Sequence, residues 1–307
     1  MSHVPDFNNN YSPTQTLRTI LTINRVPETI GYNIAYFAIG LGLSPDDPVI
    51  AFNQYLLPVG VLFAAVMLSK MQASIADALH DQDLDAENPE KSFIANSVAH
   101  LGGDAAYTLL VSEIILGLAL WSWLTHTTGS LLYVVCGATM TFLGFVYSYP
   151  PRIKERGVFN HITTSGVDVT GVVLPVPILS GAALTLELAL TLAAIFCYTF
   201  AYHVLHQAGD TFYDRECGVS TFTQTLGVPR SVLLASAFTL FAGLLVFQQG
   251  YVAGSILLLV VAGGYWLLYR LIGGRTEQEQ SDYVSRWFHI GWVATCLNGG
   301  LAASLLL

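Results

Sequence analysis

Long apolar stretches alternate with short polar segments along most of the chain. Nine of them are about 20 residues long, the length that a helix needs to cross roughly 30 Å of hydrocarbon. They cover residues 17–43, 50–75, 101–124, 130–148, 161–183, 188–208, 230–249, 251–273 and 284–306. The breaks between them carry residues typical of turns, such as SPDDP at 44–48 and YPPRIKERG at 149–157. The pattern predicts an all-α bundle of nine transmembrane helices.

The composition supports a membrane protein. Only 11% of the residues are charged and 53% are hydrophobic, and the mean hydropathy is +0.55, whereas soluble domains carry about 25% charged residues. So few charges cannot coat a water-exposed surface, but a lipid-facing surface needs none. The net charge of −9 argues against nucleic acid as a partner, because nucleic-acid-binding proteins are typically basic. The first residues, MSHVPDFNNNYSPTQ, lack the pattern of a cleaved signal peptide.

The basic residues predict the orientation. If the N-terminus is cytoplasmic, all 12 Lys and Arg residues fall in cytoplasmic loops or toward cytoplasmic helix ends. Cytoplasmic loops of membrane proteins carry an excess of Lys and Arg, so this segregation supports a cytoplasmic N-terminus and an odd number of spans. Most of the acidic residues share that side. We therefore expect the charged cap loops to face the cytoplasm, and a bacterial or archaeal plasma membrane is the simplest location.

Aspartates recur at the ends of two predicted helices. Asp77, Asp81 and Asp85 are spaced i, i+4 and i+8 near the end of the second helix. Asp210 and Asp214 repeat the spacing near the end of the sixth. Residues at this spacing lie along one side of a helix. The two motifs lie four helices apart on the same side of the membrane, which indicates an internal duplication.

The duplication predicts how the domain is organised. We expect a single transmembrane domain over residues 1–307, built from duplicated four-helix units. The first half covers about 17–148 and the second about 161–306. Each half then contributes one acidic cluster to the cytoplasmic end of the bundle.

The acidic clusters are candidate metal ligands. Like charges four residues apart destabilise a helix, and carboxylates near hydrocarbon are costly, so a compensating cation is expected. Hard oxygen ligands suit Mg²⁺, which commonly bridges carboxylates to substrate phosphates. The alternative is that these aspartates are simply solvated after helix ends, but two matching motifs favour the metal. We predict Mg²⁺ ligation by Asp77, Asp81, Asp210 and Asp214.

Basic residues near these motifs are candidates for binding a diphosphate. Lys70 precedes Asp77 by seven residues, two helical turns back on the same face. A lysine in an apolar helix either extends to the interface or, as we favour here, binds a diphosphate held by the metal. For the other candidates, membrane topology and lipid headgroups are the alternative explanation. The predicted diphosphate-binding residues are Lys70, Lys91, Arg152, Lys154 and Arg215.

Together these motifs resemble those of the UbiA superfamily of intramembrane prenyltransferases. That family has nine transmembrane helices, with N-D-x-x-D-x-x-x-D after the second, Y-S-x-P-P-x-x-K after the fourth and D-x-x-x-D after the sixth. Here Tyr147-Ser148-Tyr149-Pro150-Pro151-Arg152-Ile153-Lys154 matches the middle motif. The last motif is matched by Asp210 to Asp214, followed by Arg215 and then Gly218-Val219-Ser220-Thr221. Asn88-Pro89-Glu90-Lys91 resembles a stretch that often follows the first motif, so the resemblance covers nearly the whole chain.

The first motif departs from the family pattern. Asp77 stands at the asparagine position and Ala78 replaces the next aspartate, whereas Asp81 and Asp85 are kept. The metal-facing positions in the family are the asparagine and the aspartate one turn on, so Asp77 and Asp81 still supply ligands. The absence of an acid at position 78 is expected to affect the chemistry of the acceptor more than the ionisation of the diphosphate.

The resemblance implies a Mg²⁺-dependent enzyme that ionises a polyprenyl diphosphate and transfers the prenyl group to a small acceptor. The metal and lysines stabilise the leaving group, and aromatic faces steady the allylic cation. We expect Tyr147, Tyr149 and Tyr202 to line the prenyl and acceptor site, although aromatic residues are also common interfacial anchors. Arg25 is a candidate for binding the polar head of the acceptor, or else an interfacial anchor.

Three further residues are candidate catalytic groups. Asp85 completes the first motif. Asp168 is an acid within an apolar stretch, where ionisable residues are commonly functional. It is a candidate base in place of the acid missing at Ala78. His206 precedes Asp210 by one helical turn and either orients it, moves a proton, or simply packs.

The sequence is also compatible with two other functions. An intramembrane terpene cyclase would capture the cation with its own double bonds, which the missing acid and the lack of an evident acceptor site leave possible. A transporter also combines duplicated bundles with intramembrane acids. Transporter sites, however, tend to lie near the bilayer midplane, whereas both acidic motifs here lie at helix ends.

Overall fold

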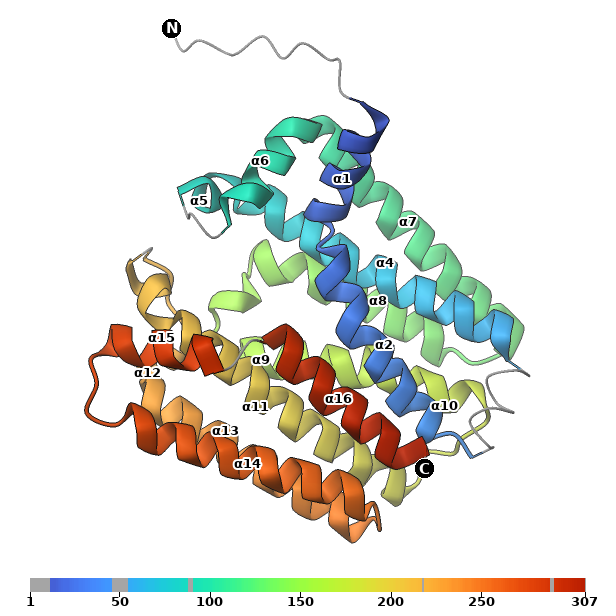
Figure 1. Cartoon of the computed structure of the whole chain (residues 1–307). Coiled ribbons are helices and arrows are strands. Elements are labelled where there is room, and N and C mark those ends of the chain that lie inside the picture. The colour runs from blue at the N-terminus through green and yellow to red at the C-terminus, as the bar shows by residue number, and fades with distance from the viewer. Residues whose placement is uncertain (1–11, 46–54, 88–90, 217, 288–289, 307) are drawn as a thin grey trace, which may run out of the picture.

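Helices make up the fold over residues 12–45, 55–87, 91–216, 218–287 and 290–306, the part of the chain that this computed structural model describes, and no strand occurs there (Figure 1). The first half contains α1 (Pro13–Ile23), α2 (Val26–Gly42), α4 (Leu56–His80), α5 (Gln82–Glu87), α6 (Ser92–Leu101), α7 (Gly103–Thr128) and α8 (Leu132–Ser148). The middle contains η1 (Ile153–Glu155), α9 (Val158–Val167), the π-helix η2 (Asp168–Val173) and α10 (Pro175–Leu179). The rest contains α11 (Leu186–Glu216), α12 (Phe222–Leu226), α13 (Val228–Gln248), α14 (Val252–Ile272), α15 (Glu277–Trp287) and α16 (Ile290–Leu306).

Helix occupies most of each predicted span. Among the described residues, six helices are long and apolar enough to cross a membrane: α4, α7, the continuous stretch Val158–Leu179, α11, α13 and α14. Two more apolar helices are shorter, Leu132–Ser148 and Val293–Leu306. The all-helical membrane architecture is therefore confirmed, while the number of nine spans stays a prediction.

Two predicted spans depart from a regular α-helix in a way that bears on the site. The first one breaks between α1 and α2, where Arg25 has a left-handed backbone with φ 48° and Pro27 follows in the first turn of α2. The fifth one widens into a π-helix at Asp168 before α10 starts at Pro175. Proline cannot donate the backbone hydrogen bond that a regular helix needs, so both irregularities have a proline as a local cause nearby.

The helices of the two halves surround a common core (Figure 1). In the first half α4, α7 and α8 pack on one another, and in the second half α11 packs on α13, which packs on α14. α2 lies against α16, so a helix from early in the chain packs on the last one. At one end, α1 packs on α6 and α15 packs on α11, which places short helices beside the acidic motifs.

The core between the halves is rich in aromatic side chains. Trp121, Tyr133, Tyr36, Tyr198 and Tyr202 are all at most 2% exposed. Close packing there depends on a small residue at position 137, because a Cβ on Gly137 would lie 2.3 Å from the Cγ of Trp121. Small residues at helix contacts let helices approach closely in a membrane, where no hydrophobic effect drives them together.

Candidate functional site

A polar cavity of about 240 Å³ lies where the ends of α4 and α11 meet η1, α5 and α9. Three of its carboxylates, Asp77, Asp81 and Asp85, come from the first half of the chain, and two, Asp210 and Asp214, come from α11. The backbone remains helix-like across the end of α4, since the Asp81 N–H donates to Asp77 O and the Asp85 N–H donates to Asp81 O. The i, i+4, i+8 spacing therefore brings all three carboxylates to the same cavity.

Basic and hydroxyl groups already compensate the first acidic cluster. Lys154 Nζ lies 2.8 Å from Asp77 Oδ1 and also contacts Asp81. Ser148 Oγ donates to Asp77 Oδ1 at 2.6 Å, and Arg25 donates to Asp77 Oδ2 at 3.2 Å. Burial lowers the pKa of Lys154, but Asp77 and Asp81 outweigh burial and raise this pKa overall. Lys154 is thus a fixed cation between the two predicted metal ligands.

A second arginine flanks the cluster from the Pro150-Pro151 break. Arg152 lies 3.6 Å from Asp81 Oδ1 and 2.9 Å from Glu155 Oε1. Among the described residues, Arg152 and Arg25 are the non-glycine residues with positive φ, 56° and 48°. Such backbone costs about 1–2 kcal/mol per residue and persists where the surroundings impose it, often at functional sites. Both strained arginines point a guanidinium at the same acidic cluster.

Asp85 lies at the rim of this cluster on α5. It is 4% exposed and lines the cavity together with Lys91. Burial raises the pKa of the Asp85 carboxyl, the nearby charges of Asp77 and Asp81 add to this, and Lys91 opposes it. An ionised Asp85 is therefore less well compensated than its neighbours.

The second acidic cluster has no such compensation. Among the described residues, no Lys or Arg forms an ion pair with Asp210 or Asp214. His206 Nε2 lies 3.9 Å from Asp210 Oδ2, and both side chains are about half exposed, at 51% and 43%. These acids therefore leave an excess of negative charge on the α11 side of the cavity.

The charge of the whole cavity fits a divalent cation. Six carboxylate residues and four Lys or Arg residues line it, which leaves a formal charge of −2 with neutral histidines. A diphosphate alone would be repelled by this charge. Within the described residues no group of three or more His, Cys, Asp or Glu side chains is arranged to hold a metal, but Mg²⁺ commonly takes one or two carboxylates together with substrate phosphates. The paired aspartates provide a donor set of that kind.

A second cavity of about 200 Å³ continues from the first into the bundle. The two share Arg25, Asp77, Tyr147, Thr164 and His203 as lining residues. Apolar side chains contribute to the wall of the second, namely Ala73, Met140, Leu143 and Val167. The site thus has a polar entrance chamber and a more apolar inner chamber.

Lys70 and Asp168 lie in the wall of the inner chamber. Lys70 Nζ contacts Asp168 Oδ1, and the two side chains are 15% and 3% exposed. Asp168 Oδ2 accepts hydrogen bonds from Tyr36 at 3.3 Å and from His203 Nε2 at 3.1 Å. The Tyr36 hydroxyl is in turn bonded to Tyr202. Asp168 is therefore ion-paired and fully hydrogen-bonded rather than free in the cavity.

The structure gathers most of the predicted site residues. Asp77, Asp81, Asp85, Asp210, Asp214, Lys91, Arg152, Lys154, Arg25, Tyr147 and His206 line the polar chamber, and Lys70 and Asp168 line the inner one. Tyr202 is buried beneath Asp168. Arg215 instead pairs with Glu277 of α15 at 2.9 Å, and Tyr149 stacks on Phe145. Arg215, Tyr149 and Tyr202 do not lie among the residues that line the two chambers. Residues 88–90, which belong to the predicted Asn88-Pro89-Glu90-Lys91 stretch, lie outside the described residues.

Several cavity residues were missed by the sequence analysis. His161 Nε2 donates to Gln207 Oε1 at 3.0 Å, and both residues line the polar chamber. His203 lines both chambers. A usable signal existed, because His203, His206, Asp210 and Asp214 follow steps of three and four residues, which place them on one helix face.

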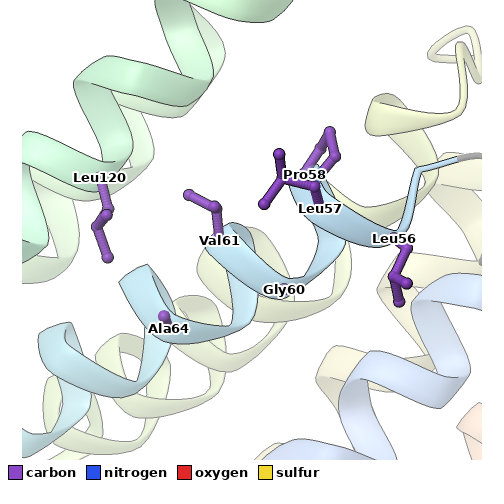
Figure 2. A pocket seen from close by; sticks show the side chains of 7 residues that line it. All are labelled: Leu56, Leu57, Pro58, Gly60, Val61, Ala64 and Leu120. Atoms are coloured by element: carbon purple, nitrogen blue, oxygen red, sulfur yellow. The ribbon is translucent and has the colours of Figure 1, made fainter.

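A larger hollow of about 550 Å³ lies elsewhere, between α4 and α7 (Figure 2). It is lined by Leu56, Leu57, Pro58, Gly60, Val61, Ala64 and Leu120, none of which is titratable. Leu57 is 68% exposed. An open apolar surface of this kind is ordinary for a lipid-facing helix pair and provides no group for chemistry.

Comparison with known proteins relates the chain to a family and to a known fold. The model of the UbiA prenyltransferase family matches residues 35–291. Among solved structures, a UbiA homologue from Archaeoglobus fulgidus bound to GPP and Mg²⁺ is 14% identical, with a TM-score of 0.66 over 94% of this chain and 99% of that chain. A digeranylgeranylglyceryl phosphate synthase is also 14% identical, with a TM-score of 0.65 over 95% of this chain and 99% of that chain.

A third similar structure is the apo form of a UbiA homologue from Aeropyrum pernix K1. It is 16% identical, with a TM-score of 0.59 over 95% of this chain and 98% of that chain. A search of the curated proteins found no match. At these identities the structural likeness establishes the fold, and the matched sequence model establishes the ancestry.

Proposed function

The chain belongs to the UbiA prenyltransferase family, and from that premise we propose that it is a Mg²⁺-dependent prenyltransferase, which ionises a polyprenyl diphosphate and transfers the prenyl group to a small acceptor. One observation carries the proposal: carboxylates from both halves of a multi-pass membrane bundle line one polar chamber, and an inner, more apolar chamber opens from it. The carboxylates suit a metal–diphosphate head, and the inner chamber suits the reacting part of a prenyl chain.

The metal ligands in this proposal are Asp77 and Asp81 from the first half and Asp210 and Asp214 from α11. When bound, Mg²⁺ supplies positive charge that offsets the cavity's excess of carboxylates and stabilises the diphosphate as it leaves. The remaining roles belong to the protein's own residues. The like spacing of the two motifs supports the duplication of the bundle that the sequence predicts.

The basic residues have two sets of partners during the reaction. Lys154 and Arg152, which pair with Asp77 and Asp81, lie within reach of any diphosphate bound between the acidic clusters. Their guanidinium and ammonium groups then donate to phosphate oxygens, where charge-assisted hydrogen bonds are short and strong. Lys91 and Arg25 border the same chamber. These groups hold the diphosphate in place while its allylic C–O bond breaks.

The inner chamber excludes water from the allylic cation. Met140, Leu143 and Val167 provide apolar contacts, and Tyr147 lies at the junction of the two chambers. An aromatic face close to a cation stabilises it, most strongly where water is absent. Hydrolysis of the cation then does not compete with its transfer to the acceptor.

The distribution of charge supports an orientation with this chamber open to the cytoplasm. All 12 Lys and Arg residues lie on the predicted cytoplasmic side. A soluble diphosphate head and a membrane-embedded prenyl tail then reach the site from the aqueous phase and the bilayer respectively. A prokaryotic plasma membrane is the location we propose.

The test is product analysis with purified protein in nanodiscs. Geranyl, farnesyl and geranylgeranyl diphosphates are each supplied with Mg²⁺, alone and with 4-hydroxybenzoate or geranylgeranylglyceryl phosphate, and the products are identified by mass spectrometry. We expect acceptor-dependent prenylated product, its loss in D77N and in D210N, and normal turnover in D104N, which changes an exposed aspartate on α7. A cyclic hydrocarbon formed without acceptor would assign a cyclase instead. Solute uptake without diphosphate consumption would assign a transporter.

A further inference from the structure

His203 lies where the two chambers join and is bonded to a buried carboxylate. It lines both cavities, and its side chain is 22% exposed. Its Nε2 lies 3.1 Å from Asp168 Oδ2. Asp168 itself is a candidate base from the sequence, but it is 2% exposed and already paired with Lys70. Of Lys70, Asp168 and His203, the imidazole of His203 is the most exposed and is the one that lines both chambers.

The hydrogen bonds of Asp168 determine the tautomer of His203. Asp168 accepts hydrogen bonds from Lys70 at Oδ1, and from Tyr36 and His203 at Oδ2. An ionised carboxylate only accepts, so His203 Nε2 must carry a hydrogen atom. In the neutral imidazole the lone pair then lies on Nδ1. No hydrogen-bond partner of Nδ1 occurs among the described residues, so this nitrogen is available to a ligand.

The other two imidazoles of the polar chamber lack this arrangement. His161 is bonded to the Gln207 amide at 3.0 Å and packs on Phe200 and Phe222. His206 is 51% exposed and lies 3.9 Å from Asp210. Only His203, among the histidines that line the two chambers, is held by a buried carboxylate. A carboxylate-oriented imidazole with a free nitrogen is the arrangement of a general base.

We propose that His203 is the general base of prenyl transfer, oriented by Asp168. This inference rests on the function proposed above. The allylic C–O bond breaks with its electron pair on the diphosphate, the acceptor atom forms a bond to the allylic carbon, and the proton of the acceptor passes to His203 Nδ1. The proton then leaves to water through the polar chamber. Lys70 stays paired with Asp168 throughout, so that Nε2 retains its hydrogen atom and Nδ1 is the nitrogen that accepts the proton.

Two substitutions separate a chemical role from a structural one. H203Q keeps a side-chain N–H for Asp168 but has no basic nitrogen, and H203A leaves space for added imidazole. H126Q, at the exposed end of α7, is the matched control. Two quantities are measured for each protein: prenylated product from geranylgeranyl diphosphate with 4-hydroxybenzoate or geranylgeranylglyceryl phosphate, and the Kd of unreactive geranylgeranyl thiodiphosphate with Mg²⁺ by calorimetry.

We expect H203Q and H203A to lose product formation by about 10²–10⁴-fold, the usual contribution of a general base. Their Kd for the analogue stays within about twofold of wild type, because the base acts on the acceptor and not on diphosphate binding. Imidazole restores part of the rate of H203A and leaves the wild type unchanged. H126Q behaves as wild type.

Two results would overturn the proposal. Product formation by H203Q at the wild-type rate would show that no base is needed there. A parallel loss of rate and analogue affinity would show that His203 only shapes the cavity. If the wild type prenylates neither acceptor, the proposed function itself fails and this inference fails with it, an outcome distinct from the other two.

Discussion

Replacing Lys70 by methionine is expected to leave a buried charge without its partner. Lys70 and Asp168 are 15% and 3% exposed, and Lys70 is the only cation paired with Asp168 among the described Lys and Arg residues. Methionine retains the length and much of the volume of the lysine stem, so packing changes little. The variant therefore reports mainly the electrostatic contribution.

Removing one partner of a buried ion pair costs about 3–5 kcal/mol. Here Asp168 keeps its hydrogen bonds from Tyr36 and His203, which stabilise the remaining charge, so we expect the lower end, about 3 kcal/mol. That is roughly a hundredfold change in the unfolding equilibrium. In K70M/D168N the orphan charge is gone, and most of the loss should be recovered.

The measurement is reversible unfolding in mixed micelles, titrated with dodecyl sulfate and followed by tryptophan fluorescence, for the wild type, both single variants and the double variant. The coupling energy from this cycle should favour the pair by at least about 1 kcal/mol. Two results would refute a paired, dehydrated Lys70–Asp168 site. One is a K70M protein destabilised by less than about 1 kcal/mol, and the other is a double variant whose loss of stability exceeds the sum of the two single losses.

The remaining predictions concern the polar chamber. R25A and R25G both lose the contact with Asp77 and should weaken binding of geranylgeranyl thiodiphosphate with Mg²⁺. The free energy of unfolding of R25G should be about 1 kcal/mol higher than that of R25A, because glycine adopts the left-handed backbone without strain. Equal stability of the two variants would contradict a strained Arg25. Because burial raises the pKa of Asp85 above the ordinary 3.8, its ionised form is disfavoured in the folded protein, and D85N should be more stable than the wild type at pH 7 without Mg²⁺. This advantage should disappear as the pH falls through the raised pKa toward 3.8, and a constant advantage across that range would contradict the assignment.

Local patterns in the sequence predicted much of the site. The spacing of Asp77, Asp81 and Asp85 places three carboxylates along one helix side, and this depends only on helical geometry. Asp210 and Asp214 follow the same rule on α11. All five line one chamber. The long apolar stretches likewise predicted the helical membrane fold, because a bilayer allows few alternatives.

Ion pairs between residues far apart in the sequence were harder to predict. Arg25 meets Asp77 across 52 residues and Lys154 meets it across 77, and no local pattern sets such distances. Lys70 and Asp77 share a helix face and border the same inner chamber, yet the closest partner of Lys70 is Asp168, 98 residues away. Buried charges pair wherever the fold brings opposite signs together, which requires the packing to be known.

Local irregularities of the helices account for the other features that the sequence did not predict. The apolar pattern runs continuously through residues 17–43, so the break at Arg25 has only Pro27 as a hint. The π-helix at Asp168 likewise leaves no mark in the hydrophobic pattern, although such turns frequently occur at functional sites. His203 was missed because a strict spacing of four selects Tyr202, His206 and Asp210, whereas a helix of 3.6 residues per turn alternates steps of three and four.

The most direct test of the shared chamber is a double-variant cycle on ligand binding. Calorimetry gives the Kd of geranylgeranyl thiodiphosphate for the wild type, D81N, D214N and D81N/D214N, each with Mg²⁺ and with EDTA. We expect binding only with Mg²⁺, a loss of about tenfold or more in each single variant, and a loss in the double variant that is smaller than the two losses combined. Equal affinity in EDTA, or independent effects of the two aspartates, would contradict a diphosphate held jointly by both halves of the bundle.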